Sequence, residues 1–302
     1  MLFTNPRTAS NLLQKLLSGQ DRFGSSGYFL FDAAFKLFFE ILNKGQRAKD
    51  TDATQWQQRM TAYQEGFEKL LKQIEEDKQN GRVPFIKEHV DVLVDPINLF
   101  KTAYPDDEGE HYVVKYPGQE GHPVSTSNLV VPDDFLLSVF PVILIRHPAL
   151  MFPSFYRAQR DLGFDLNSPW LRIFMDLRWT EQLLVWYREH DVEPIVIDGD
   201  SVIKERAVVE KLCEMCGMEK EKIQWTWEPE KQPEDKYAVR FKSTLTNSTG
   251  IREDKHTNGL DIEEECGKWK AEFGEDIGGQ IEVKVKNTMP YYSRLREQRL
   301  QA

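Results

Sequence analysis

The first seventeen residues constrain the fold of this chain more than any other stretch. A short apolar run is followed by Pro6-Arg-Thr-Ala-Ser-Asn11, after which apolar residues recur at positions 12, 13, 16 and 17. This pattern predicts a strand, a tight turn and a helix. Backbone N–H groups in such a turn lie at the positive end of the helix dipole, where they favour an anion. An ordinary capped helix accounts for the same residues.

The composition excludes several classes of protein. The chain has 302 residues, 40% of them hydrophobic, which is enough for one large α/β domain or for two smaller ones. Its 49 acidic and 39 basic residues give a net charge of −10, which opposes binding to nucleic acid or to anionic membranes. No apolar stretch reaches the roughly 18 residues that span a bilayer, and Arg7 and Asn11 interrupt the N-terminus too early for a signal-peptide core. We therefore expect a cytoplasmic protein in which any basic site is local.

Strand and helix patterns alternate along the remaining chain. Apolar runs predict buried strands at 83–86, 141–145 and 194–198. Helical periods and start signals predict helices over 53–78, from Pro132, through Ser154 and over 170–190. The alternation predicts a single α/β domain over residues 1–302, a three-layer sandwich with a mainly parallel central sheet.

Two regions depart from this alternation. Residues 104–127 are acidic and irregular, so we expect a lid or an excursion from the sheet. From about Trp225 the chain becomes more polar, and we expect it to wrap the sheet and to end in a helix after Met289-Pro290.

The three cysteines do not indicate a disulfide framework or a metal site. Cys213 and Cys216 lie within a helical pattern without a second pair, and Cys266 stands alone. We expect no bound metal.

Polar side chains follow the predicted strands. Lys87, Glu88 and His89 come after the strand at 83–86, and Arg146 comes after the strand at 141–145, with Ser154 eight residues later. Ligands bind beyond the carboxyl ends of the strands in open α/β sheets. Where a chain passes from a strand into the following helix, an arginine at the strand end and a serine in the helix can converge on one phosphate. The arginine binds it through its guanidinium and the serine through its hydroxyl.

These motifs, in this order, resemble the sulfotransferase family, which has a P-loop type of fold and uses 3′-phosphoadenosine 5′-phosphosulfate (PAPS) as donor. Arg7-Thr-Ala-Ser-Asn11 resembles the loop that cradles the 5′-phosphosulfate, and Arg146 with Ser154 resembles the pair that binds the 3′-phosphate. Phe85-Ile-Lys-Glu-His89 is similar to the Lys-x-His segment of the family. The loop and the late Met-Pro-Tyr-Tyr at 289–292 look most like those of divergent sulfotransferase-like proteins of fungi.

The resemblance implies a role for each matching residue. His89 would remove the proton of the acceptor, Lys87 would reach the leaving oxygen, and Arg7 would hold the transferred group. The donor would be bound by the loop and by the later pair: Arg7, Thr8, Ala9, Ser10, Asn11, Arg146 and Ser154.

The resemblance implies, as acceptor, a hydroxyl of a small, fairly apolar molecule such as a secondary metabolite. Aromatic residues are candidate walls for it, although they also suit a core. These candidates are Tyr28, Phe31, Tyr156, Trp170 and Phe174.

Two alternatives remain open at this point. The same fold could perform nucleotide-independent elimination, cyclisation or hydrolysis of a natural product, with His89 and Lys87 as the working pair. It could also be a non-catalytic protein that binds a nucleotide or a metabolite.

Overall fold

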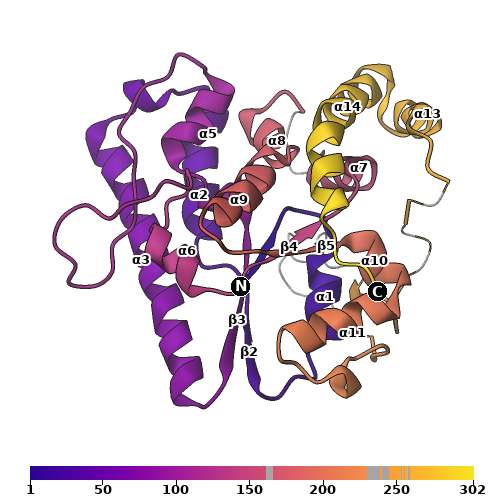
Figure 1. Cartoon of the computed structure of the whole chain (residues 1–302). Coiled ribbons are helices and arrows are strands. Elements are labelled where there is room, and N and C mark those ends of the chain that lie inside the picture. Colours follow the sequence, from indigo (N-terminus) through magenta and orange to yellow (C-terminus); the bar gives the residue numbers. More distant parts are fainter. Residues whose placement is uncertain (161–165, 230–238, 240–244, 253, 255, 258) are drawn as a thin grey trace. The chain divides into compact units, whose positions relative to one another are not determined.

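The computed structural model describes residues 1–160, 166–229, 239, 245–252, 254, 256–257 and 259–302, and for Trp170 the backbone alone (Figure 1). The chain divides into two compact units, each built from three separate stretches. Unit 1 comprises Met1–Asn5, Arg22–Ile143 and Asn167–Pro194, and unit 2 comprises Pro6–Asp21, Leu144–Leu166 and Ile195–Ala302. Strand β4 (Val142–Ile145) contributes residues to both units. The interpretation as one domain stays a prediction.

A five-stranded sheet is at the centre of the fold. Its order is β2-β3-β1-β4-β5, and all strands are parallel. The other strands are β1 (Leu2–Thr4), β2 (Phe23–Ser26), β3 (Val83–His89) and β5 (Ile195–Asp198). β1 pairs Thr4 with His89 of β3 and Leu2 with Val142 of β4. The α/β class with a parallel sheet is confirmed, whereas the edge strand β2 was not expected from the sequence.

Unit 1 contains the long helix predicted over 53–78. It is α3 (Ala53–Gln79), capped by Asp52, whose carboxylate accepts from Thr54 N and Gln55 N at 2.9 and 3.1 Å. The unit also holds α2 (Phe31–Glu40), η1 (Leu42–Lys44), η2 (Ala48–Asp50), α4 (Val90–Leu93), α5 (Pro96–Ala103), α6 (Asp133–Ser138), α8 (Pro169–Phe174) and α9 (Arg178–Glu189).

The prediction of a single helix over 170–190 is wrong. This stretch forms two helices, α8 and α9, which are separated by residues 175–177. Asp176 explains the break, because its carboxylate accepts from Arg178 N at 2.8 Å. An aspartate that bonds the backbone two residues on forms a turn in competition with the helix.

Unit 2 contains α1 (Ser10–Leu16), α7 (Pro148–Gln159), α10 (Gly199–Lys204), α11 (Arg206–Met215), η4 (Lys220–Lys222), α13 (Ile262–Phe273) and α14 (Glu275–Glu297). The final helix starts well before the expected position after Met289-Pro290 and continues through Pro290. Proline removes one helical hydrogen bond, but the buried residues Ile281, Val285 and Tyr292 keep α14 packed on both sides of it. Beyond α14, Leu300 N donates to Val196 O of β5 at 2.7 Å, so the C-terminus lies against this strand.

Residues 104–127, all of which the structure describes, form neither helix nor strand. This segment is nevertheless held along its length within unit 1. Lys115 exchanges two hydrogen bonds with the Gln64 side chain of α3, at 2.8 and 2.9 Å. Val114, which is fully buried, donates its N–H to Val130 O at 2.8 Å. A function as a lid stays a prediction.

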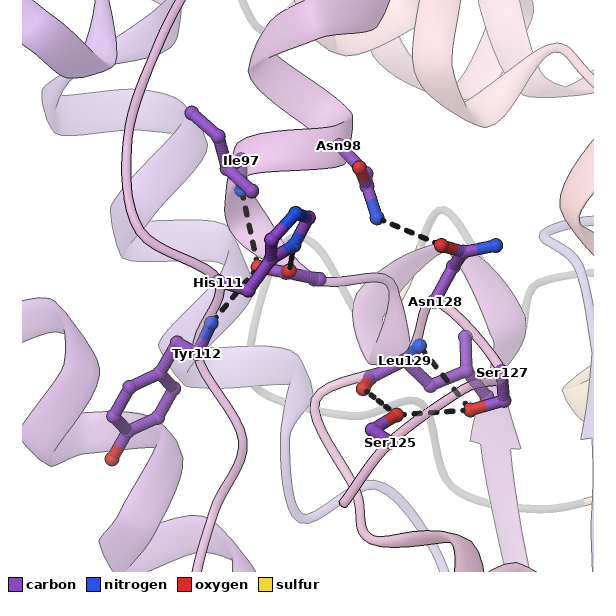
Figure 2. A network of polar contacts seen from close by, with 9 residues as sticks. Ile97, Asn98, His111, Tyr112, Ser125, Ser127, Asn128 and Leu129 are labelled. Atoms are coloured by element: carbon purple, nitrogen blue, oxygen red, sulfur yellow. Dashed lines mark hydrogen bonds and ion pairs between the residues drawn. The ribbon is translucent and has the colours of Figure 1, made fainter. Parts of the chain in front are cut away.

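The carboxylate of Asp95 joins His111 and Tyr112 of this segment to the first turn of α5. Figure 2 shows His111 and Tyr112 beside Ile97. The Asp95 carboxylate, only 3% exposed, caps α5 by accepting from Ile97 N at 3.3 Å, accepts from Tyr112 N at 3.4 Å, and pairs with His111. Nearby, Asn98 Nδ2 donates to Asn128 Oδ1 at 3.4 Å. One carboxylate thus joins a helix cap to the excursion.

No helix in the described part of the chain is both long enough and apolar enough to cross a membrane.

Replacing Asp95 with alanine should destabilise unit 1 by about 1–2 kcal/mol, because the cap of α5 and the contacts to His111 and Tyr112 are lost together. Urea unfolding should show the shift, and limited proteolysis should cut faster within 104–127. Asp106→Ala is the matched control, since Asp106 is exposed and pairs only at the surface with Arg47 and Lys49. Equal stability and equal cleavage in the two variants would contradict this account of the segment.

Candidate active site

The opening loop belongs to unit 2 and joins β1 to α1 as predicted. Arg7 and Ala9 both adopt left-handed backbone conformations, with φ of 69° and 70°. Such conformations are costly for residues other than glycine, and here they turn the chain sharply out of the strand. Thr8 and Ser10 are buried. Ala9 is the N-cap and offers α1 no side-chain hydrogen bond, so the first N–H groups of the helix depend on other acceptors.

Arg146 and Ser154 meet this loop. Arg7 Nε donates to Ser154 Oγ at 2.9 Å, and Arg146 donates from its guanidinium to Arg7 O at 3.1 Å. β4 ends directly before Arg146, and α7 carries Ser154 on its second turn. Arg7 therefore converges within unit 2 with two residues, Arg146 and Ser154, that lie far along the sequence from it. The sequence predicted this group, and its use as a donor site stays a prediction.

A glycine that the sequence analysis did not single out lies against the same loop. A Cβ on Gly199, at the start of α10, would lie 3.0 Å from Thr8 O and 3.1 Å from Arg146 Cγ. A larger residue would push either the loop or the arginine away. In the sequence, the glycine between two aspartates at the end of β5 was the feature that could have indicated this close approach.

Acidic groups surround Arg146 within unit 2. Burial lowers the pKa of this guanidinium, while Asp200 and Asp198 raise it. Asp198 is itself fixed, because it accepts from Tyr292 Oη at 2.7 Å and from Asp200 N at 2.9 Å. The arginine therefore keeps its charge and its orientation.

A hollow of about 430 Å³ lies in unit 2 beside the residue that follows Arg146. Its walls are His147, Thr257, Leu260, Met289, Tyr292, Ser293, Arg296, Glu297 and Arg299. His147 Nδ1 accepts from Ala149 N at 3.1 Å, and burial lowers the pKa of this imidazole to about 4. The hollow thus combines a neutral imidazole, an aromatic ring and two arginines.

The candidate acid–base residues lie in unit 1. Lys87, Glu88 and His89 are the last three residues of β3, not residues beyond its end as predicted. His89 is 7% exposed, with Nδ1 2.6 Å from Thr4 Oγ1 and Nε2 3.0 Å from Tyr28 Oη. Thr4 Oγ1 also lies 3.2 Å from Glu88 O, to which it donates.

These contacts favour the Nδ1–H tautomer of His89. In this tautomer all three hydrogen bonds can form, because Thr4 Oγ1 accepts from Nδ1–H while donating to Glu88 O, and Nε2 keeps a lone pair for the Tyr28 hydroxyl. Burial, followed by the charge of Lys87, lowers the pKa of His89 well below its usual range. The imidazole is therefore neutral near neutral pH and can accept a proton at Nε2.

Tyr28 and Phe31, two of the candidate acceptor walls, lie beside His89. The Tyr28 ring is 4.7 Å from the His89 ring and 5.5 Å from the Phe31 ring. Lys87 Nζ lies over the Tyr28 ring, 4.7 Å from its centroid. Four residues predicted from the sequence therefore form one cluster in unit 1.

The other three aromatic candidates lie elsewhere. Phe174 is 1% exposed and packs on Phe38 at 5.6 Å, within the core of unit 1. Tyr156 belongs to unit 2, where its ring packs on Phe273 at 5.2 Å. Trp170 is in α8, but its side chain lies outside the described residues. Their role as acceptor walls stays a prediction.

Sequence reasoning missed the role of Glu88. This carboxylate is fully buried and accepts from Leu30 N at 3.1 Å and from Phe29 N, just before α2. Burial raises its pKa to about 8, although both N–H groups lower it. Its other oxygen has no hydrogen-bond partner among the described residues. A single carboxyl group thus holds the turn that follows Tyr28.

No group of three or more histidine, cysteine or acidic side chains in the described ranges is arranged to hold a metal ion.

Glu88→Gln should change the pH dependence of stability. The pKa in the folded protein, about 8, exceeds the ordinary value of 4.5, so the native state holds this proton over a range where the unfolded chain has lost it. The stabilisation from Glu88 is therefore lost as the pH rises from about 4.5 to about 8. Denaturant unfolding at pH 5 and pH 9 should show the variant gaining at least about 1 kcal/mol relative to wild type. Glu76→Gln, at a half-exposed carboxylate on α3, should show no such gain; a gain in both variants, or in neither, contradicts the assignment.

Ala9→Gly should stabilise the protein by about 0.5–1 kcal/mol, because glycine relieves the left-handed conformation and this outweighs its greater entropy when unfolded. Ala62→Gly, within α3, should instead destabilise it by about 1 kcal/mol. The two shifts, measured by chemical denaturation, should have opposite signs. Destabilisation by Ala9→Gly would show that the loop is not strained at this residue.

Comparisons with known proteins match the whole chain to sulfotransferases, the family that the sequence motifs resemble. The chain is 31% identical to sulfotransferase ppzF of Metarhizium rileyi (strain RCEF 4871) over 328 aligned positions, covering 100% of this chain and 96% of that protein. It is 30% identical to sulfotransferase ppzF of Metarhizium majus (strain ARSEF 297), with the same coverage. No family model and no solved structure matches it. The chain therefore belongs to the sulfotransferase family, as a relative of these fungal proteins.

Proposed function

We propose that this protein transfers a sulfuryl group from PAPS to a hydroxyl of a small, fairly apolar secondary metabolite. The observation that carries the proposal is the convergence of Arg7, Arg146 and Ser154 at the loop before α1. An arginine fork, a second arginine and a hydroxyl suit phosphate and sulfate oxygens.

The contacts within unit 2 support a separate binding position for each part of the donor. The 5′-phosphosulfate would lie at the loop, held by Arg7, by the hydroxyl groups of Thr8 and Ser10, and by N–H groups up to Asn11 at the start of α1. The 3′-phosphate would take the positions on Arg146 and Ser154. The hollow beside His147, with the ring of Tyr292 and the charge of Arg296, offers a volume for the nucleoside.

The contacts within unit 1 support the chemistry on the acceptor. His89 Nε2 would take the acceptor proton as the acceptor oxygen bonds to sulfur and the bond from sulfur to the donor phosphate breaks. Lys87 would stabilise charge on the leaving oxygen, and Arg7 would stabilise charge on the sulfuryl group. The half-buried rings of Phe31, Phe35 and Phe39 follow one another along α2 at 5.8 and 4.3 Å, which favours an apolar acceptor.

Adenosine 3′,5′-bisphosphate, the product of the donor, tests the proposal directly. Arg7→Ala and Arg146→Ala should each raise its Kd at least about tenfold, because each removes a charge-assisted hydrogen bond. The double variant should lose less than the sum of the two single losses, since residues on one ligand are coupled.

Arg206→Ala is the matched control, because Arg206 is in unit 2 but lies over the ring of Trp225. Calorimetric titration should show it binding as tightly as wild type. A wild type that does not bind the nucleotide, or an Arg7→Ala variant that binds unchanged, would overturn the donor assignment.

A second candidate is favoured by one observation: the cluster of His89, Lys87 and Tyr28 is complete within unit 1. Such a cluster could perform elimination, cyclisation or hydrolysis without a nucleotide. Turnover that continues without PAPS and stops in His89→Ala would favour that chemistry. Nucleotide binding without turnover, insensitive to His89→Ala, would instead indicate a binding protein.

A further inference from the structure

The base of the cluster in unit 1 is not directly open to an acceptor. His89 is 7% exposed, and its two ring nitrogens contact Thr4 and Tyr28. The Tyr28 hydroxyl lies 3.0 Å from Nε2, which is the nitrogen that must receive the proton. An acceptor hydroxyl must therefore either displace Tyr28 or deliver its proton through it.

Several contacts oppose the displacement of Tyr28. Glu88 accepts from the N–H groups of the next two residues, Phe29 and Leu30, and so fixes the backbone beside the tyrosine. The ring itself packs on Phe31 at 5.5 Å and lies under Lys87 Nζ at 4.7 Å. Movement of the ring would break this packing and leave the buried imidazole nitrogen without its donor.

Tyr28 also has the exposure and the chemistry that a relay requires. It is 38% exposed, whereas the imidazole behind it is buried. A phenol donates through its proton and accepts at its oxygen, so it can hold His89 on one side and a hydroxyl on the other. The ammonium of Lys87 over the ring favours negative charge developing on the phenol oxygen.

We propose that the Tyr28 hydroxyl relays the acceptor proton to His89, and that Glu88 is the positioning residue that holds Tyr28 for this transfer. The inference rests on the proposed sulfuryl transfer. As the acceptor oxygen bonds to sulfur, its proton moves to Tyr28 Oη and the Tyr28 proton moves to His89 Nε2. The bond from sulfur to the donor phosphate breaks with its electron pair, and the tyrosine ends the step as it began, as a neutral phenol.

The relay geometry can be tested without an acceptor. In protein carrying ¹⁵N-labelled histidine, of which there are six, His89 should be the Nδ1–H tautomer at neutral pH. Tyr28→Phe should shift the Nε2 resonance, because the hydrogen bond from the phenol is lost, and should leave Nδ1 unchanged. Tyr112→Phe is the control and should shift neither nitrogen. A His89 in the Nε2–H form, or an Nε2 resonance that does not respond to Tyr28→Phe, overturns the relay.

Glu88 is tested by the same resonance. Glu88→Gln keeps a carbonyl oxygen for the two N–H groups and should keep the wild-type Nε2 position, whereas Glu88→Ala should move it toward that of Tyr28→Phe. A folded Glu88→Ala variant with the wild-type resonance would remove Glu88 from the proposal.

Turnover adds a kinetic test, with PAPS as donor and 2-naphthol as the probe acceptor. Tyr28→Phe should lower kcat at least about tenfold with little change in the KM for PAPS, because the proton transfer is lost and the donor contacts are not. Unchanged or faster turnover in Tyr28→Phe would make Tyr28 a gate and overturn the relay.

The two proposals can fail separately. If the wild-type protein does not bind the nucleotide, the proposed function is wrong. The ¹⁵N spectrum of His89 would then still test the hydrogen bond between Tyr28 and His89. Intact nucleotide binding in Tyr28→Phe, together with an unchanged spectrum, would end the relay alone.

Discussion

The parallel pairing of β1 with β3 and β4 is the constraint on which the rest of the structure depends. β1 is only three residues long, and its register sets Thr4 opposite His89. This register allows the threonine hydroxyl to bond the imidazole, and it ends the strand immediately before the loop that begins at Pro6. A shift of one residue would turn Thr4 to the other face of the sheet and remove the contact between its hydroxyl and His89 Nδ1.

Burial decides the protonation states along β3. Lys87, Glu88 and His89 alternate between the two faces of the sheet, and each is nearly inaccessible to water. Removal of water raises the pKa of Glu88 and lowers the pKa of His89, so both groups favour their neutral forms. The consequence is an imidazole that can receive a proton and a carboxyl group that serves as a structural acceptor.

The strained backbone of the opening loop is held in place by its contacts within unit 2. Arg7 and Ala9 are held in conformations that cost about 1–2 kcal/mol for residues with a Cβ. The loop is fixed in unit 2 by hydrogen bonds from Arg146 and to Ser154, and by the close approach of Gly199. Residues held in rare conformations by their surroundings are typical of sites that bind ligands, because the geometry is set before the ligand arrives.

The sequence by itself determined the parts whose signals are local. The strand, turn and helix at residues 1–17, the helix α3 and the apolar strands β3, β4 and β5 follow from periodicity and turn residues. Arg146 and Ser154 were predicted because an arginine directly follows an apolar strand and a serine comes eight residues later, a spacing that resembles that of the sulfotransferase family. The tertiary structure alone decided the break between α8 and α9, the passage of α14 through Pro290, and the attachment of Tyr28 to His89. These depend on side chains distant in sequence, on packing that outweighs local propensity, and on burial, which no linear pattern encodes.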